Sequence, residues 1–156
     1  MGSASGNVSQ LLKGYLDYLE IEKGRSIKTR ENYQRYLKLF VQRQNIKTIN
    51  DLTEKNIKAF RLALARTGLK KVSQSYYVIA IRNFLKYLSR QNYTVIAADR
   101  IELPKLPVRQ FDMVSNDELE RLLKAPSSHT LKGLRDRAIL ELLFSTGLRI
   151  SELCAL

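Results

Sequence analysis

Residues 142–153 read LLFSTGLRISEL, and this stretch is the most informative one in the chain. Its first half has the apolar character of a buried helix, and Gly147 stands where a left-handed residue would end that helix. Arg149 then opens a second helix, with Glu152 three residues later on the same face, where the carboxylate can fix the direction of the guanidinium. Such an arginine suits a phosphate, because its fork donates two hydrogen bonds and the free amides at a helix start add positive potential. The residues alone leave open a plainer alternative, a surface ion pair at a helical corner.

The segments around this stretch also follow a helical pattern. Ser115 and Glu118 form a capping box, which predicts a helix that ends by Pro126. Another helix is predicted over residues 131–145, and Cys154 is expected to be a small buried hydrophobe in the last helix. The side of the 131–145 helix that we expect to be buried consists of Leu134, Ala138, Ile139, Leu142 and Leu143.

Apolar residues recur every three or four positions over the first 93 residues, which predicts four amphipathic helices in a compact bundle. The first three helices are expected at about residues 8–24, 27–43 and 53–68, and the fourth from residues 73–75 to about residue 90. Ser26 is the expected cap of the second helix, and Ile27 and Leu37 lie on its apolar stripe. No segment alternates as a strand would, so the fold class is all-α. The tyrosines expected in the core are Tyr15, Tyr33, Tyr36 and Tyr77.

Charge is distributed unevenly along the chain. Of 156 residues, 27 are Lys or Arg and 15 are Asp or Glu, which gives a net charge of +12. Residues 1–93 carry 18 basic and 6 acidic side chains, whereas residues 94–156 carry 9 of each. The excess therefore belongs to the first part, which predicts a basic module with a polyanionic partner. Nucleic acid is the first candidate partner, and an anionic membrane is the second.

The composition argues against several classes of protein. A single cysteine cannot form an internal disulfide, and a single histidine leaves no cluster for zinc, so we expect no metal and no cofactor. No apolar run approaches the roughly 20 residues that span a bilayer, and the start lacks the regions of a signal peptide. The chain is therefore expected to be cytoplasmic, with no membrane partner, and residues 1–7 to be a leader or tag remnant.

The stretch at residues 142–153 resembles the first-arginine motif of the tyrosine recombinases, the phage integrase and Xer family. That motif is an apolar helix followed by Thr-Gly-aliphatic-Arg, an aliphatic residue, a small residue and Glu-Leu. The second and fourth predicted helices resemble those of the family's SAM-like core-binding domain, and the later segments follow in the family's order. The residues that match the motif are Phe144, Thr146, Gly147, Leu148, Arg149, Ser151, Glu152 and Leu153.

The resemblance covers residues 8–156 and implies a domain organisation. It places a four-helix SAM-like core-binding domain at residues 8–93, a linker at 94–114 and the truncated start of a catalytic domain at 115–156. The function implied is DNA binding within site-specific recombination, with double-stranded DNA as partner and nucleoid association as location. The full-length protein would assemble as a tetramer on DNA, and for this chain the expectation is a dimer or a domain swap through its apolar end.

In the family a tyrosine cleaves a DNA strand and forms a 3′-phosphotyrosyl intermediate, which a 5′-hydroxyl of a partner strand then attacks. By resemblance, Arg149 is the first arginine of the pocket around the scissile phosphate, and Glu152 supports it. The family's second arginine, lysine and nucleophilic tyrosine lie further along than Leu156, so none of the eight tyrosines is assigned as nucleophile. The chain by itself is expected neither to cleave nor to join DNA.

The resemblance also implies that the second and fourth helices contact the major groove. Basic side chains there would touch phosphates, whereas Thr29, Gln74 or Ser75 would read base edges. Lys105 and Arg109 would follow the DNA backbone from the linker. The expected DNA contacts are Lys28, Thr29, Arg30, Arg35, Lys71, Ser73, Gln74, Ser75, Tyr76, Arg82, Lys105 and Arg109.

Two other functions fit the basic helical module. One is a standalone helical DNA-binding regulator or excision accessory factor, which needs no catalytic residues. The other is a helical interaction module whose basic face binds an acidic protein or an anionic membrane. Because fold analogy does not separate these classes, the choice of a recombinase depends on the Arg149 segment.

Overall fold

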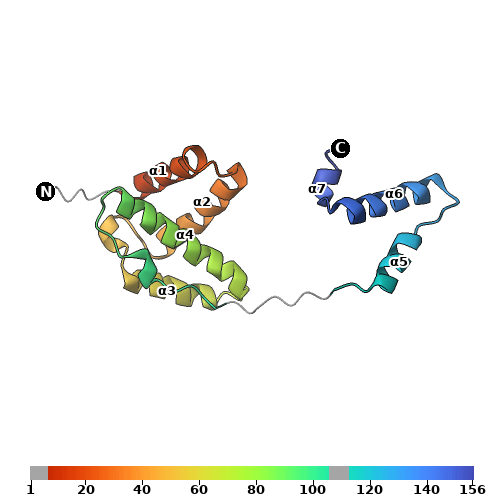
Figure 1. The fold of residues 1–156 in the computed structure, drawn as a ribbon. Helices are drawn as coiled ribbons and strands as arrows, with labels where there is room; N and C mark the ends of the chain where they lie inside the picture. Colours follow the sequence, from red (N-terminus) through yellow and green to blue (C-terminus); the bar gives the residue numbers. More distant parts are fainter. Residues whose placement is uncertain (1–6, 106–112) are drawn as a thin grey trace. The chain divides into compact units, whose positions relative to one another are not determined.

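The structure of the chain is a computed structural model, which describes residues 7–105 and 113–156. The chain divides into two compact units between residues 107 and 108 (Figure 1). Within the described residues the regular elements are helices, and one isolated antiparallel bridge joins Asn7 to Thr48. The all-α fold class predicted from the sequence is therefore confirmed.

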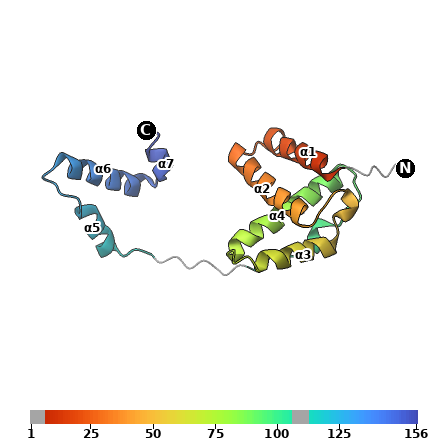
Figure 2. The same cartoon turned by 180° about the vertical axis from the view of Figure 1, so that it is seen from behind.

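The first unit is built around one long helix. Its elements are α1 (Val8–Ile21), α2 (Ile27–Arg43), the 3₁₀ turn η1 (Ile49–Asp51), α3 (Glu54–Ala65), α4 (Lys71–Arg90) and the 3₁₀ turn η2 (Ala98–Arg100). Helix α4 packs against α1, α2, α3 and η2, as Figures 1 and 2 show from opposite sides. Helix α4 is therefore the shared partner of the other elements.

The second unit contains α5 (Asn116–Lys124), α6 (Leu131–Thr146) and α7 (Ile150–Leu153), and α5 packs against α6. The predicted capping box is present, since the Ser115 hydroxyl accepts from the Glu118 amide and the Glu118 carboxylate accepts from the Ser115 amide. Gly147 ends α6 with φ +67°, a left-handed conformation that favours glycine. Both predictions for this unit's turns are confirmed.

Aromatic side chains fill the core of the first unit. Phe40 and Phe60 meet edge to face with their ring centroids 5.1 Å apart, and Tyr15 lies 5.3 Å from Phe84. Of the four tyrosines expected in the core, Tyr15 is fully buried, and the other three pack against the core while partly exposed. Aromatic pairs of this kind add to the burial of apolar surface that stabilises the bundle.

The structure differs from the sequence prediction at the start of α4. The helix begins at Lys71, two to four residues before the predicted start at residues 73–75. Ser75 does not cap it, because its hydroxyl lies inside the first turns and donates to the carbonyl of Val72 at 2.6 Å. Gln74 instead donates its side-chain amide to the carbonyl of Leu69, 2.7 Å away, in the turn before the helix.

Residues beyond α4 take part in the core of the first unit. Ala98 and Ile101 are buried, and Tyr93, Val95 and Ile96 pack against the cluster. Although no helical period predicts it, this segment covers α4 through η2. The first unit therefore uses part of the stretch that the sequence interpretation treats as a linker.

Several residues that were expected to be buried are exposed. Ile27, placed on the apolar stripe of the second helix, is 68% exposed, because it is the first residue of α2 and the buried residues of that helix lie ten or more positions later. In the second unit Cys154 is exposed, as are Leu134, Ala138 and Leu142 of α6. Among the described residues the short α5 is the main element that packs on α6, so most of the apolar side of α6 has no cover there.

None of the helices in the two described ranges is long and apolar enough to cross a membrane. The same ranges contain no group of three or more His, Cys, Asp or Glu residues that could hold a metal ion.

Leu37 and Ile27 lie on the same predicted stripe but differ in burial. Substitution of these two residues should therefore have different effects on the free energy of unfolding. Leu37→Ala is expected to lower the free energy of unfolding by about 2–5 kcal/mol, because it leaves a cavity in the core. Ile27→Ala is expected to change it by less than about 0.5 kcal/mol. Urea denaturation followed by circular dichroism measures both values, and equal losses would contradict the structure.

Asp51 caps η1, since its Oδ2 accepts from the amides of Thr48 and Lys47 at 2.8 and 2.9 Å. These hydrogen bonds, led by that of Thr48, lower the pKa of Asp51 below its ordinary value. The stabilisation is therefore present above the ordinary pKa and is lost as the pH falls through the lowered one. We expect acidification to destabilise the parent protein more than Asp51→Asn, as measured by thermal unfolding from pH 7 downward. A constant difference between the two proteins would refute this role.

Candidate nucleic-acid interface

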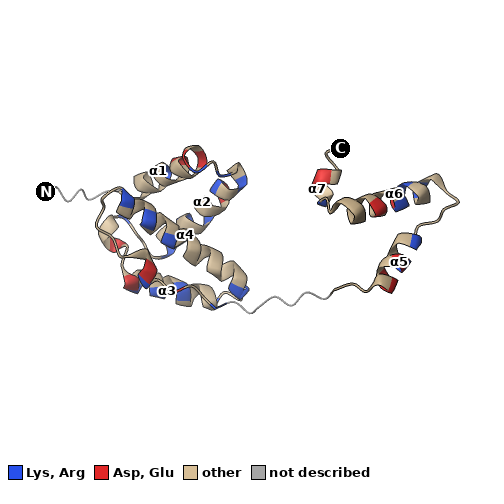
Figure 3. Cartoon of the chain, viewed as in Figure 1, with Lys and Arg blue, Asp and Glu red and all other residues tan. Residues whose placement is uncertain are grey.

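The basic side chains of the first unit lie mainly on α2, α3 and α4 (Figure 3). Their neighbours decide which of them remain available to a polyanion. Some form ion pairs within the unit, whereas others stand exposed at the edges of a groove or beside aromatic rings. The residues expected to contact DNA fall into both classes.

Arg30 forms ion pairs within the bundle. Its Nε lies 2.9 Å from Oε2 of Glu20, and its Nη2 lies 3.7 Å from Oδ1 of Asp17, both on α1. The Arg30 side chain is also largely buried. It therefore joins α2 to α1 and presents little charge to solvent.

Arg82 is engaged in a similar way. Its Nη2 donates to Oδ1 of Asp99 at 3.2 Å, and only 21% of its side chain is exposed. Asp99 belongs to η2, so this pair fastens η2 to α4. Sequence reasoning missed this contact because the two residues are 17 positions apart.

Two hydroxyls expected to read bases have partners nearby. Ser75 is buried, and its hydroxyl bonds to the Val72 carbonyl within α4. The Thr29 hydroxyl lies 3.0 Å from the hydroxyl of Ser26, which also accepts from the Thr29 amide as the cap of α2. Thr29 therefore takes part in the cap at the start of α2, and Ser75 does not reach the surface.

An exposed stack joins α2 to α4. The guanidinium of Arg35 lies 5.2 Å from the centroid of the Tyr36 ring, and Tyr36 is nearly parallel to Tyr76 with centroids 6.5 Å apart. Tyr76 is 51% exposed. Arg35 and Tyr76, which are 41 positions apart, therefore both lie beside the Tyr36 ring, and flat groups of this kind can take a base or a sugar edge.

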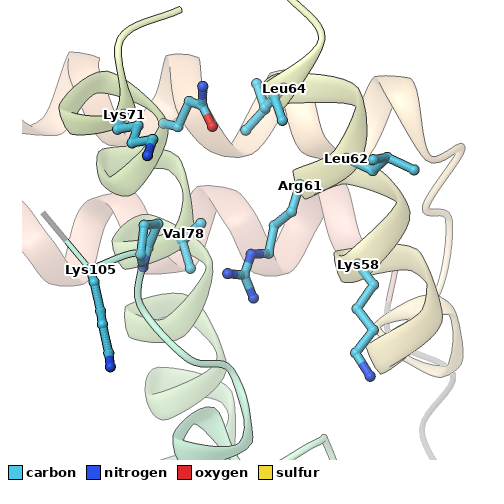
Figure 4. A pocket seen from close by; sticks show the side chains of 10 residues that line it. Lys58, Arg61, Leu62, Leu64, Lys71, Val78 and Lys105 are labelled. Carbon is cyan, nitrogen blue, oxygen red and sulfur yellow. The ribbon is translucent and has the colours of Figure 1, made fainter.

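A groove of about 460 Å³ lies between α3 and the start of α4, with Pro104 and Lys105 along one side. Figure 4 shows the guanidinium of Arg61 reaching into the space between the two helices. Of the residues that line it, all within the described part of the chain, none is acidic. The basic members are Lys58, Arg61, Lys71 and Lys105, and Gln74 also lines the groove.

Sequence reasoning identified Lys71, Gln74 and Lys105 but missed Lys58 and Arg61. The signal was available, because these two residues stand three apart on α3 and off its buried stripe. Lys58 pairs with Glu54 at 2.6 Å, whereas no acidic side chain of the described residues lies within ion-pairing distance of Arg61. Lys28 pairs with Glu31 at 3.4 Å on an open surface, Ser73 is half-buried, and Arg109 lies outside the described residues.

In the second unit the expected pairing of Arg149 with Glu152 is present. Arg149 Nη1 lies 3.2 Å from Glu152 Oε1, and the Arg149 amide donates to Glu152 Oε2 at 2.7 Å. The Glu152 carboxylate therefore holds both the backbone and the side chain of Arg149. The Arg149 side chain is 82% exposed, so it remains accessible to a further anion.

Comparison with protein families gives two matches. Residues 12–92 match the model described as "Phage integrase, N-terminal SAM-like domain", and residues 112–156 match "Phage integrase family". The first match takes in α3 and α4, which form two sides of the groove, but not Pro104 and Lys105, and the second takes in the Arg149 segment.

Among curated proteins, the chain is 37% identical over 158 residues to a tyrosine recombinase XerC of Myxococcus xanthus, covering 96% of this chain and 51% of the relative. It is 34% identical over 151 residues to a tyrosine recombinase XerD of Staphylococcus haemolyticus, covering 92% and 50%. A tyrosine recombinase XerC of Bacillus licheniformis is 32% identical over 158 residues, with coverage of 96% and 51%. The chain spans about half the length of these relatives.

Proposed function

The chain belongs to the phage integrase family, and we propose that it is the DNA-binding, N-terminal part of a site-specific tyrosine recombinase. The first unit would bind duplex DNA as the core-binding domain, and the second would begin the catalytic domain. The observation that carries the DNA-binding proposal is the α3–α4 groove, which has four basic residues and no acidic one among its described lining.

The proposed interface consists of side chains that are at least partly exposed, and it excludes the arginines whose ion pairs join one element of the bundle to another. Phosphates would lie along the groove, and the stack of Arg35 on Tyr36 and Tyr76 would contact the adjoining sugar or base edge. Arg30 and Arg82 would act by holding α1 and η2 in place, so their effect on binding would be indirect. The residues proposed to contact DNA are Lys28, Arg35, Lys58, Arg61, Lys71, Ser73, Gln74, Tyr76 and Lys105.

For the second unit we propose that Arg149 contacts the scissile phosphate and that Glu152 positions it. In the full-length protein a tyrosine hydroxyl would attack the phosphorus, form the 3′-phosphotyrosyl bond and release the 5′-hydroxyl of the broken strand. The guanidinium would neutralise the nonbridging oxygens as charge builds on them. Self-association, assembly as a tetramer on DNA and nucleoid association belong to the same proposal.

Removing the two groove cations of α3 should weaken DNA binding in a salt-dependent way. Each phosphate contact adds about 0.9 to the slope of log affinity against log salt concentration. We therefore expect Lys58→Ala with Arg61→Ala to reduce that slope by about 2, as measured by fluorescence anisotropy on a labelled duplex.

The matched control is Lys13→Ala with Arg43→Ala, which removes the same charge from exposed positions outside the groove. The control should leave the slope nearly unchanged. Equal losses in the two double variants would overturn the groove assignment, and failure of the parent chain to bind duplex DNA even at low salt would favour a protein-interaction module.

Arg149→Ala, placed in a recombinase that contains this chain, should reduce strand cleavage roughly 100- to 1,000-fold while duplex binding persists. Cleavage is measured as covalent protein–DNA complex on a nicked suicide duplex. Glu152→Gln, which keeps an oxygen acceptor for the Arg149 amide but loses the charge, should cause a smaller loss than Glu152→Ala. Full cleavage by Arg149→Ala would disprove the assigned role.

A further inference from the structure

We propose that a second cavity of the first unit is a binding site for a phosphoryl group. The cavity has a volume of about 220 Å³ and lies where the end of α1, the start of α2 and the last turns of α4 meet. It shares no lining residue with the α3–α4 groove. Its lining is dominated by two kinds of side chain, phenols and cations.

Two of the phenols that line the cavity already accept hydrogen bonds from other residues of its lining. Tyr18 Oη accepts from Arg90 Nη1 at 3.1 Å, and Tyr33 Oη accepts from Asn83 Nδ2 at 2.9 Å. A hydroxyl that accepts one hydrogen bond still has its own proton to donate. Both phenols can therefore donate to a ligand without losing their present contacts.

The buried hydroxyl of Tyr15 is a second, independent feature that points to a ligand. Its side chain is only 1% exposed, and its hydroxyl has no hydrogen-bond partner among the described residues. Buried hydroxyls are nearly always hydrogen-bonded, so this one is suited to an acceptor placed in the cavity that it lines. Burial raises the pKa of Tyr15, which keeps the phenol protonated and able to donate.

The cations give the cavity its charge. None of its lining residues, all of which are described, carries a carboxylate. Lys23 Nζ lies over the Tyr18 ring, 5.7 Å from its centroid, and Lys86 Nζ lies 3.9 Å from Oδ1 of Asp99, its ion-pair partner among the described residues. The four basic residues of the lining are Lys23, Arg25, Lys86 and Arg90.

A cavity lined by donors and cations selects a compact anion with several acceptor oxygens. A phosphoryl group meets this requirement, since each of its oxygens can accept from a phenol, a guanidinium or an ammonium group. The group can come from a phosphodiester of DNA or from free phosphate. The first source rests on the proposed function, whereas the second is independent of it.

Inorganic phosphate is the probe for the site itself. We expect saturable chemical-shift changes in a two-dimensional NMR titration of the whole chain, centred on residues around the cavity, with chloride at matched ionic strength as reference. Tyr15→Phe removes the donor without breaking a protein hydrogen bond, and it should weaken phosphate binding roughly tenfold. Tyr77→Phe, which changes a phenol outside both the cavity and the proposed DNA interface, should leave phosphate binding unchanged.

Arg25→Gln is the second variant, because it removes a cation without an ion-pair partner among the described residues. It too should weaken phosphate binding. No saturable binding to the parent chain, or unchanged binding in both Tyr15→Phe and Arg25→Gln, would overturn the proposal.

Duplex DNA identifies the source of the phosphoryl group. If Tyr15→Phe weakens DNA binding and phosphate competes with DNA, the site holds a backbone phosphate. If DNA binding is unchanged while phosphate binding falls, the site serves a free phosphoryl ligand. Both outcomes support the site, and its test is separate from that of Lys58 and Arg61 in the groove.

Discussion

The first unit depends on the burial of α4. Val78, Ile81, Phe84, Leu85 and Leu88 are almost fully buried, because α1, α2, α3 and η2 all pack around this helix. A helix enclosed along most of its length can present polar groups mainly at its ends and along one narrow face. The groove lies beside the first turns of α4, and the second cavity of the first unit lies beside its last turns. Both concave basic sites therefore follow from this constraint.

Local features were predictable from the sequence, because both partners lie within a few residues of each other. The Ser26 cap, the capping box at Ser115, the left-handed Gly147 and the pairing of Arg149 with Glu152 are all of this kind. Propensity and capping rules describe such contacts directly. The class of fold followed from the same signals, repeated over the whole chain.

Contacts between residues far apart in the sequence were not predictable. Arg30 and Arg82 stood among the expected DNA contacts, yet the acidic partners of Arg30 lie 10 and 13 positions away and that of Arg82 lies 17 positions away. The groove was not predictable for the same reason, since Lys58 and Arg61 are far from Lys71 and Lys105 in the sequence and line one groove only in the folded unit. Burial was misjudged where a residue had the right period but no covering element, as with Ile27 and Cys154.

The tyrosines around the smaller cavity have an optical consequence. Tyr15 lies 5.1 Å from Tyr87 and 6.3 Å from both Tyr18 and Tyr33, measured between ring centroids, and the chain contains no tryptophan. Intrinsic fluorescence and near-ultraviolet circular dichroism of this protein therefore come from tyrosine and phenylalanine, and rings packed this closely exchange excitation energy. Four of its eight tyrosines meet at one corner of the bundle, so a large share of the emission reports on that corner without any added label.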